Sequence, residues 1–453
     1  MNLPELIRKY DVPVPRYTSY PTVPLWQTDK FTVSGWWAAV TQSFNESNEL
    51  KGISLYVHLP FCESLCTYCA CNTRITKNHG VEDTYIDTVL AEWEMYRKHF
   101  GAVPVIRELH FGGGTPTFFS PENLSRLVKG LLKDCRKHPR FEFSFEGHPN
   151  NTTSEQLQVL AENGFQRVSF GVQDLDLKVQ TAINRIQPFE NVERVGNASR
   201  ELGYQSIGFD LIYGLPYQTV ESVSETVRKV ISLRPDRIAF YSYAHVPWLR
   251  PGQRGYEDAD LPSDVTKRLL YESGRALFHR AGYRDIGMDH FALPDDSLSI
   301  AVDQGRLHRN FMGYTTNQTD LLIGLGASSI SDAKYAFAQN LKKVEDYQNH
   351  IKRNESAVFK GHLHTAEDML YRRIILDIAC KGELSEVLLT ATMDETTSML
   401  LEQMEQEGLV KMHTKGMSVT PAGRAFIRNI CHVFDKRSRD EGTRGSRLFS
   451  KAI

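Results

Sequence analysis

The chain has 453 residues, of which 41% are hydrophobic and 24% charged, and its formal net charge at pH 7 is −2. This length allows two cores, because a single core stops growing beyond about 250–300 residues. The near-neutral charge argues against a generally basic nucleic-acid-binding surface, and no apolar run approaches the roughly 20 residues of a membrane span. Pro4 and Glu5 stand where a signal peptide would need an apolar core. We therefore expect a cytoplasmic monomer that binds neither nucleic acid nor membrane.

Residues 1–50 are expected to form an N-terminal extension. Within them, the segment Pro15-Arg-Tyr-Thr-Ser-Tyr-Pro-Thr22 is bracketed by prolines, which disfavour a helix in the residue before them. From the pattern alone, we expect an extended arm that packs on the surface of the molecule.

Strand-like apolar runs alternate with amphipathic helical runs from Ile53 to about His245. The first strand begins at Ile53, and five more are predicted: Val105–Phe111, Phe141–Phe145, Arg167–Val172, Ser206–Tyr213 and Arg237–Tyr243. The helices between them include Val81–Phe100, one with Ser120 as N-cap and Pro121 at its first position, one from Ser154 to Gly164, and Val220–Leu233. Parallel neighbours need such crossover helices, so six units predict an α/β fold with a parallel sheet. Six units fall short of a closed eightfold barrel, which leaves a curved partial barrel or a doubly wound sheet.

Chemically active residue types follow the predicted strands. The loop Cys62–Cys71 follows the first strand, and the turn Gly112–Thr117 follows the second. The third and fourth strands end at Glu146 and Gln173, the fifth contains Asp210, and Tyr243-Ala-His245 closes the sixth. Because the loops at the carboxyl ends of parallel strands converge, we expect the active site at this edge.

Four of the seven cysteines lie in the first of these loops, at Cys62, Cys66, Cys69 and Cys71. Three thiolates spaced x3 and then x2 can point at one centre and fill three corners of a four-iron cluster, leaving one iron open. An open coordination position is typical of a catalytic metal rather than a structural one. A zinc knuckle is the alternative, but it needs a second cysteine pair, and the remaining cysteines are isolated: Cys135, Cys380 and Cys431. Clustered free thiols also fit a reducing compartment.

The motif Cys62-x3-Cys66-x2-Cys69, preceded by Tyr56-Val-His-Leu-Pro-Phe, resembles the radical S-adenosylmethionine (SAM) enzymes. With Cys71 added, the loop is similar to that of the oxygen-independent coproporphyrinogen III oxidases, whereas the related haem chaperones typically have no cysteine at this position. The resemblance spans nearly the whole chain. It implies a partial (β/α)6 radical SAM barrel over residues 51–361.

The resemblance also implies an activity. Two propionates of coproporphyrinogen III would be oxidatively decarboxylated to vinyls by 5′-deoxyadenosyl radical chemistry, giving protoporphyrinogen IX in haem biosynthesis. The implied cofactors are a [4Fe-4S] cluster and SAM, two molecules per active site, and the implied partners are an unidentified electron donor and acceptor. Another tetrapyrrole-directed radical SAM enzyme, such as a haem-opening one, and a haem chaperone are alternatives. A zinc-stapled DNA binder is a further one.

Site residues carry over from this family by position. The metal ligands are Cys62, Cys66 and Cys69, and the catalytic candidates are Tyr56, Glu146 and Cys71, of which Cys71 is not expected to ligate iron. The first SAM site matches Tyr56, Gly113, Glu146 and Ile330. The second matches Tyr68, Gly114, Thr115, Gln173, Arg185, Asp210 and Ala244. Without the resemblance, the glycines are equally consistent with an ordinary turn, and Glu146 is consistent with an acidic surface residue. Arg185 and Asp210 could simply form a structural ion pair.

Two positions depart from the family pattern near these sites. Gly147-His148 follows Glu146 where the family has a more acidic sequence, and Met312 stands where the family often has glutamine. Both departures bear on the geometry of the SAM sites and on whether the second one is occupied.

Residues 285–335 are rich in glycine and aromatic side chains and show too little period to predict strands or helices. By the resemblance, His290, His308 and Arg309 are candidates to face the substrate propionates. Arg16 is a further candidate, in an arm that would cover the active site. Without the resemblance, these side chains are equally expected to be solvated or to form hydrogen bonds with the backbone.

From about residue 362 to 453 the pattern predicts helices, a small hairpin within Gly408–Thr420 and a further helix, which resembles a winged-helix module. Lys411, Lys415 and Arg424 could contact DNA, but the segment is not markedly basic, so a packing or substrate-covering role is favoured. The charged tail beyond Lys436 is expected to be mobile.

Overall fold

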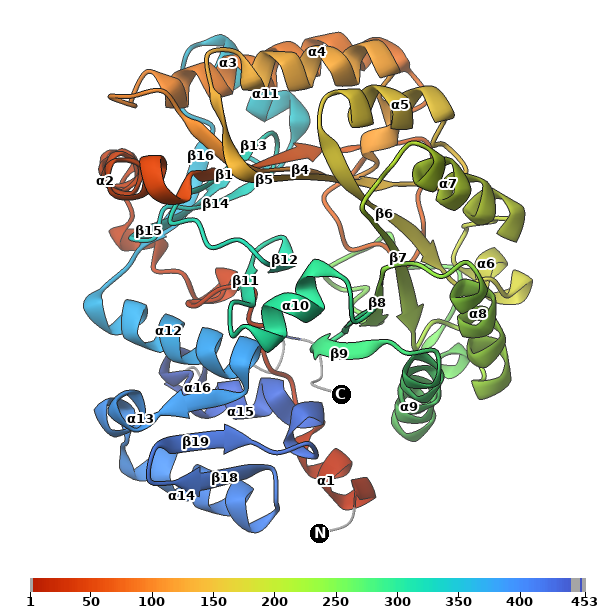
Figure 1. The fold of residues 1–453 in the computed structure, drawn as a ribbon, viewed down its shortest axis with the longest axis vertical. Helices are drawn as coiled ribbons and strands as arrows, with labels where there is room; N and C mark the ends of the chain where they lie inside the picture. Colours follow the sequence, from red (N-terminus) through yellow and green to blue (C-terminus); the bar gives the residue numbers. More distant parts are fainter. Residues whose placement is uncertain (1–2, 441–448, 450–453) are drawn as a thin grey trace.

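A single curved sheet organises the molecule, and the computed structural model describes residues 3–440 and 449 of the chain (Figure 1). Six strands lie side by side in chain order and run parallel, as the sequence predicts. They are β1 (Ile53–Leu59), β4 (Val105–Gly113), β5 (Arg136–Gly147), β6 (Phe165–Gln173), β7 (Ser206–Tyr213) and β8 (Arg237–Ser242). Their apolar side chains are almost fully buried, which is expected where helices cover a parallel sheet.

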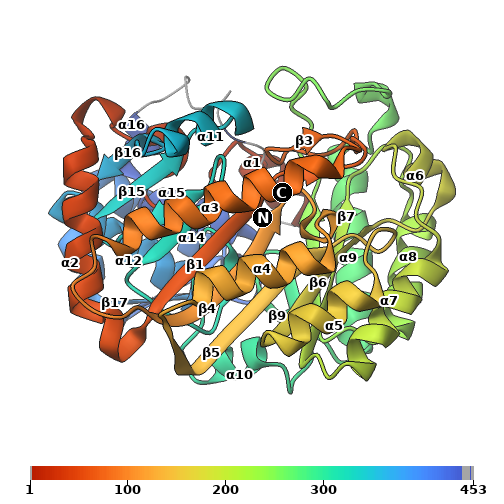
Figure 2. The same ribbon diagram turned by 90° about the horizontal axis from the view of Figure 1, so that it is seen from above.

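Helices cover the outer, convex face of these strands (Figure 2). They are α3 (Glu82–Arg97), α4 (Pro121–Leu132), α5 (Ser154–Glu162), α6 (Leu177–Ala182), α7 (Phe189–Glu201), α8 (Val220–Ser232) and α9 (Asp264–Arg280). The predicted start of α4 is confirmed, because the Ser120 hydroxyl accepts the N–H of Asn123 with Pro121 at the first position. Helix α5 begins with a capping box between Thr153 and Gln156.

The sheet extends beyond the six predicted strands at both edges. Beside β1, β13 (Leu322–Leu325) adds a seventh parallel strand, followed by antiparallel β14 (Ile330–Asp332), β15 (Ala336–Asn340) and β16 (Val358–Leu363). Beyond β8 lie β10 (His290–Ala292) and β9 (Arg284–Gly287). The outermost strands β16 and β9 do not pair with each other in the described residues, so the sheet is an open arc.

Regular elements in residues 285–335 correct the expectation of an irregular segment. Besides the edge strands, it contains α10 (Ser297–Asp303) and a hairpin of β11 (His308–Asn310) and β12 (Gly313–Thr315). These strands have three or four residues and little solvent on either side, so neither alternation nor length marks them in the sequence. The hairpin lies within the arc (Figure 1), where the side chains of Thr315 and Asn317 donate to the Glu108 carboxylate of β4.

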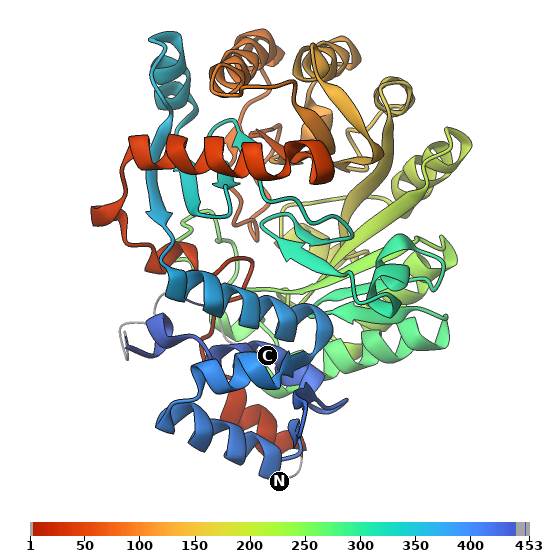
Figure 3. The ribbon, with the colours of Figure 1, turned by 60° about the vertical axis from the view of Figure 1, so that its left-hand side comes forward.

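A second, smaller core lies below the arc (Figure 3). It combines α12 (Ala366–Lys381), α13 (Glu386–Thr392), α14 (Glu395–Gln406), α15 (Ile427–Val433) and α16 (Lys436–Asp440) with a sheet of β17 (Glu383–Ser385), β18 (Val410–His413) and β19 (Gly416–Val419). The predicted hairpin is β18–β19. Of the predicted mobile tail beyond Lys436, all residues but 437–440 and 449 lie outside the described residues.

The N-terminal extension contacts both cores. Helix α1 (Leu3–Tyr10) and the tyrosines Tyr17 and Tyr20 pack into the smaller core, and the Tyr17 hydroxyl lies 3.1 Å from Oδ2 of Asp435. Helix α2 (Val33–Lys51) packs on the large core. Residues 15–22 contain no helix, as predicted, and none of the described helices has the length and apolar character to cross a membrane.

One buried carboxylate holds α3 against the strands at the β1 edge. Glu92 is 3% exposed and accepts hydrogen bonds from the Gly326 N–H (2.8 Å), the Tyr347 hydroxyl (2.7 Å) and the Asn340 amide (2.6 Å). Burial raises the pKa of Glu92 to about 7 despite these donors.

We expect Glu92→Ala to lower the free energy of unfolding by about 2–4 kcal/mol, because it removes the acceptor of the buried Gly326 N–H and Tyr347 hydroxyl and one acceptor of the Asn340 amide. Urea denaturation under anaerobic conditions measures this. Glu94→Ala, on the exposed side of the same helix, should change it by less than about 0.5 kcal/mol. Equal effects of the two variants would contradict the role of Glu92.

Candidate active site

The cysteine loop leaves the carboxyl end of β1 and is closed at its base. Strand β2 (Phe61–Cys62) pairs with β3 (Arg74–Ile75), and the Arg74 N–H donates to the Pro60 carbonyl. The turn after β4 is attached to the same base, since the N–H groups of Gly114 and Thr115 donate to the carbonyls of Leu59 and Phe61. The first two predicted motifs therefore lie against each other.

Two further segments clamp the loop. From the end of α6, the Asn184 amide donates to the Leu65 carbonyl at 2.8 Å. From the segment after β8, the Gln253 amide donates to the carbonyls of Tyr68 and Ala244, at 3.1 and 3.0 Å, and the Tyr256 hydroxyl donates to the Thr67 carbonyl. The loop backbone is thus fixed by three different strand ends.

The four thiols differ in their surroundings. Cys62, Cys66 and Cys69 are partly buried, and Cys71 is exposed. The Cys62 sulfur lies 3.2 Å from the Thr115 hydroxyl, and Nη1 of Arg185 donates to the Cys66 sulfur at 3.6 Å. Burial raises the pKa of Cys62 to about 11, whereas hydrogen bonding from Cys71 lowers the pKa of Cys69 to about 7.

Three thiols are the donor set of an iron–sulfur cluster. In the part of the chain that the structure describes, no three His, Cys, Asp or Glu side chains are gathered closely enough to hold one ion. A four-iron cube is larger than an ion, so its cysteines must stand farther apart. The Arg185 guanidinium beside Cys66 provides positive charge for a thiolate-bound cluster, and its Nε is buried without a hydrogen-bond partner.

The residues expected around a first SAM lie together at the ends of β1, β4, β5 and β14. The Gly113 N–H donates to Oε2 of Glu146 at 3.2 Å, and Tyr56 pairs in register with Gly324, which packs directly against the backbone of Ile330. Burial acts to raise the pKa of Glu146, but hydrogen bonding from His110 and Gly113 holds it below its ordinary value.

The residues expected around a second SAM gather near Arg185. Gln173 adopts a left-handed backbone (φ 66°), which brings its side chain and that of Arg185 to the same face of Gly171. Asp210 accepts from the Ser169 hydroxyl at 3.0 Å, and burial raises its pKa to about 7. Gln253 links Tyr68 to Ala244, so this group is also contiguous with the cysteine loop.

Glycine at positions 113 and 114 is required by the chain itself. A Cβ on Gly113 (φ 119°) would lie 2.7 Å from the His58 ring, and one on Gly114 would lie 2.5 Å from the Pro60 carbonyl oxygen. The close approach here is between the turn and the cysteine loop, so these glycines are not by themselves a sign of a ligand.

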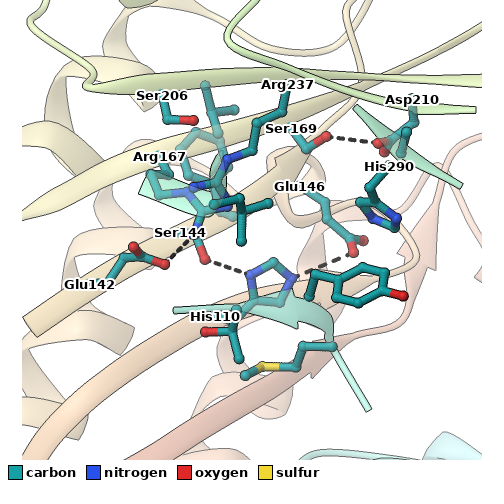
Figure 4. A pocket seen from close by; sticks show the side chains of 18 of the residues that line it. His110, Glu142, Ser144, Glu146, Arg167, Ser169, Ser206, Asp210, Arg237 and His290 are labelled. Atoms are coloured by element: carbon teal, nitrogen blue, oxygen red, sulfur yellow. Dashed lines mark hydrogen bonds and ion pairs between the residues drawn. The ribbon is translucent and has the colours of Figure 1, made fainter. Parts of the chain in front are cut away.

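A polar cavity of about 140 Å³ lies inside the arc (Figure 4). Glu146, Asp210 and His290 border it, and below them His110 bridges Ser144 (2.8 Å) and Glu146 (3.5 Å). Sequence reasoning missed His110, Ser169 and Gln253. Of these, His110 alone had a signal in the sequence, because it lies two residues, or one strand repeat, before the glycine triplet that begins at Gly112.

The remaining sequence candidates lie around this interior. Met312 borders the cavity, and the His148 N–H donates to the Thr117 hydroxyl beneath the glycine turn. Arg16 donates to the Ser242 carbonyl at the end of β8, and His308 is partly buried on β11. Lys411, Lys415 and Arg424 are exposed on the smaller core.

Comparisons with known proteins agree with this geometry. Residues 56–230 match the model of the radical SAM superfamily. The oxygen-independent coproporphyrinogen III oxidase of Pseudomonas aeruginosa is 39% identical over 95% of each chain, and that of Escherichia coli is 38% identical over 99% of this chain and 98% of its own. The solved structure of the coproporphyrinogen III oxidase from Escherichia coli, described as a radical SAM enzyme, superposes with a TM-score of 0.87 over 94% of this chain and 99% of its own, at 36% identity. The chain therefore belongs to the oxygen-independent coproporphyrinogen III oxidases of the radical SAM superfamily.

Proposed function

We propose that this chain catalyses the oxygen-independent oxidative decarboxylation of two propionates of coproporphyrinogen III to vinyl groups, which yields protoporphyrinogen IX for haem biosynthesis. Full-length relatives are named for this enzyme. The observation that carries the proposal is the position of three partly buried thiols beside Arg185, next to a polar interior bordered by Glu146 and Asp210.

Cys62, Cys66 and Cys69 would hold three irons of a [4Fe-4S] cluster and leave the fourth for the amino and carboxylate groups of SAM. When bound, the cluster and SAM would supply 5′-deoxyadenosyl radical chemistry, which removes a hydrogen atom from a propionate. Each propionate then loses carbon dioxide and one electron to become a vinyl. The reaction therefore also needs an electron donor and an electron acceptor.

Glu146 and its neighbours would bind the SAM at the cluster. The carboxylate is ionised at neutral pH, so it can accept the ammonium group in a charge-assisted hydrogen bond. His110 fixes one carboxylate oxygen and the Gly113 N–H the other, which orients the group before SAM arrives. The Tyr56 ring, stacked 5.9 Å from the His110 ring, and Ile330 would complete the wall.

Arg185, Asp210 and Gln173 would bind a second SAM, with the guanidinium on its carboxylate and Asp210 on its ribose hydroxyls. Two bound SAM molecules would provide one radical for each of the two decarboxylations. Thr115, Gly114, Tyr68 and Ala244 would form the rest of this site through their contacts with the cysteine loop.

The interior hairpin and the N-terminal arm would exclude water from the reacting groups. Strand β12 is attached to β4 through Glu108, and the arm is attached to the smaller core through Tyr17 and Asp435. An enclosed site limits the side reactions of a reactive carbon centre.

The proposal is tested by anaerobic incubation of reconstituted protein with SAM, a reductant and coproporphyrinogen III. We expect protoporphyrinogen IX with two carbon dioxide molecules released per product, and release of deoxyadenosine. Absence of both carbon dioxide and deoxyadenosine from cluster-loaded protein would contradict the proposal.

Single serine variants of Cys62, Cys66 and Cys69 should lose the four-iron cluster, because each removes one of three thiolates. Iron and sulfide content after anaerobic reconstitution measures this. Cys71→Ser and Cys135→Ser should both retain the wild-type iron content. Iron loss in Cys71→Ser would mean that the cluster has a fourth protein ligand and no open iron.

Binding of the second SAM should strengthen as the pH rises from 6 to 8. The buried Asp210 has a pKa of about 7, and its ionised form is the better acceptor for hydroxyl groups, so the affinity should increase by up to about 10-fold over this range. Equilibrium dialysis with labelled SAM should give about two molecules per chain at pH 8. Asp210→Asn should bind about one, without this pH dependence, and exposed Asp83→Asn should behave as wild type. A stoichiometry of one in wild type at every pH would contradict the second site.

A further inference from the structure

Arg309 is a buried cation that forms no ion pair with any residue that the structure describes. The residue is 7% exposed, and its Nε and Nη1 are buried without a hydrogen-bond partner. Among the residues that the structure describes, no carboxylate lies within ion-pair distance of it. Arg237, which is equally buried, does have such a partner in Asp296, at 2.8 Å. Burying an unpaired charge is costly, so this position has a stability cost that calls for an explanation.

The surroundings hold the Arg309 guanidinium in place. Arg309 lies on β11 opposite Tyr314 of β12, and its guanidinium carbon is 4.5 Å from the centre of the Tyr314 ring. The Tyr314 hydroxyl in turn accepts the Met288 N–H and donates to the Ala379 carbonyl, both at 3.3 Å. With Thr315 attached to Glu108, the hairpin is fixed on both sides. Arg309 is therefore a pre-oriented group rather than a mobile surface side chain.

A second unpartnered nitrogen lies nearby. His290 contacts the Tyr314 ring, with 5.3 Å between ring centres, and its Nδ1 is buried without a partner. Burial, together with the charge of Arg309, lowers the pKa of His290 to about 3. His290 and Tyr314 border the interior cavity, and Figure 4 shows His290 on the side where Glu146 and Asp210 point inward. Arg309 borders the small space under the arm at Tyr17–Tyr20.

We propose that Arg309, with His290 beside it, forms a buried carboxylate-binding site that takes one propionate of the tetrapyrrole substrate; this inference rests on the proposed function. A carboxylate supplies the acceptor oxygens that these nitrogens lack, and a planar guanidinium can bind both oxygens. The carboxylate of SAM is the other source of this chemistry. However, the arginine in contact with a candidate cluster ligand is Arg185, at Cys66, whereas Arg309 lies on the interior hairpin and borders the space under the N-terminal arm.

The test compares two porphyrins that cannot react. Coproporphyrin III and its tetramethyl ester are titrated anaerobically into cluster-loaded protein, and binding is followed by fluorescence. We expect Arg309→Met to weaken binding of the free acid about 10- to 100-fold and to leave that of the ester within about 2-fold. Arg306→Met, an exposed position three residues earlier in the chain, serves as the matched control and should change neither.

Thermal unfolding separates binding from a structural role. Arg309→Met loses the contact with the Tyr314 ring but also removes a buried charge that has no ion-pair partner among the described residues, so it should unfold at the wild-type temperature or above. An arginine with a purely structural role would give a lower unfolding temperature. Arg309→Lys keeps the positive charge but not the planar guanidinium. Its affinity for coproporphyrin III should lie between those of the wild type and Arg309→Met. An unchanged ratio of acid to ester affinity in Arg309→Met overturns the inference, as does a loss of SAM affinity with porphyrin binding unchanged. Failure of the wild type to release carbon dioxide would contradict the proposed function alone, since the binding comparison does not depend on turnover.

Discussion

The fixed backbone of the cysteine loop is the constraint on which the site depends. A loop of this length would otherwise sample many conformations, and a cluster can form only if three thiols face one centre. Hydrogen bonds from Asn184, Gln253 and Tyr256 to loop carbonyls remove that freedom. These donors come from segments after β6 and β8, so the loop is ordered only when the arc is assembled. The fold and the metal site are therefore coupled.

Charge is distributed unevenly around this loop. Arg185 lies on the thiol side, while the carboxylates of Glu146 and Asp210 point into the interior. Their pKa values are shifted in opposite directions, because His110 and Gly113 donate to Glu146, whereas burial dominates at Asp210. Two acidic groups on β5 and β7 can thus serve different parts of a ligand. Arg309 and His290 add unpartnered donors farther along the same interior.

The sequence predicted the six central strands and their helices because those strands are long, apolar and separated by well-capped helices. It also placed the candidate residues at the correct edge, since strand ends in a parallel sheet must converge. Strands β9–β14 were missed because elements of three or four residues are too short to show a hydrophobic period. Gln253 and Ser169 had no local signal at all: their roles arise from contacts across the fold. That Arg309 has no ion-pair partner among the described residues is likewise a property of packing, which the sequence does not show.

The central claim is that one iron of the cluster has no protein ligand and is available to SAM. Electron–nuclear double resonance on the reduced cluster, with SAM labelled at its amino nitrogen or carboxylate oxygens, tests this most directly. The account predicts hyperfine coupling between the labelled atoms and the cluster that disappears when SAM is removed. A reduced cluster that shows no coupling at saturating SAM would contradict it.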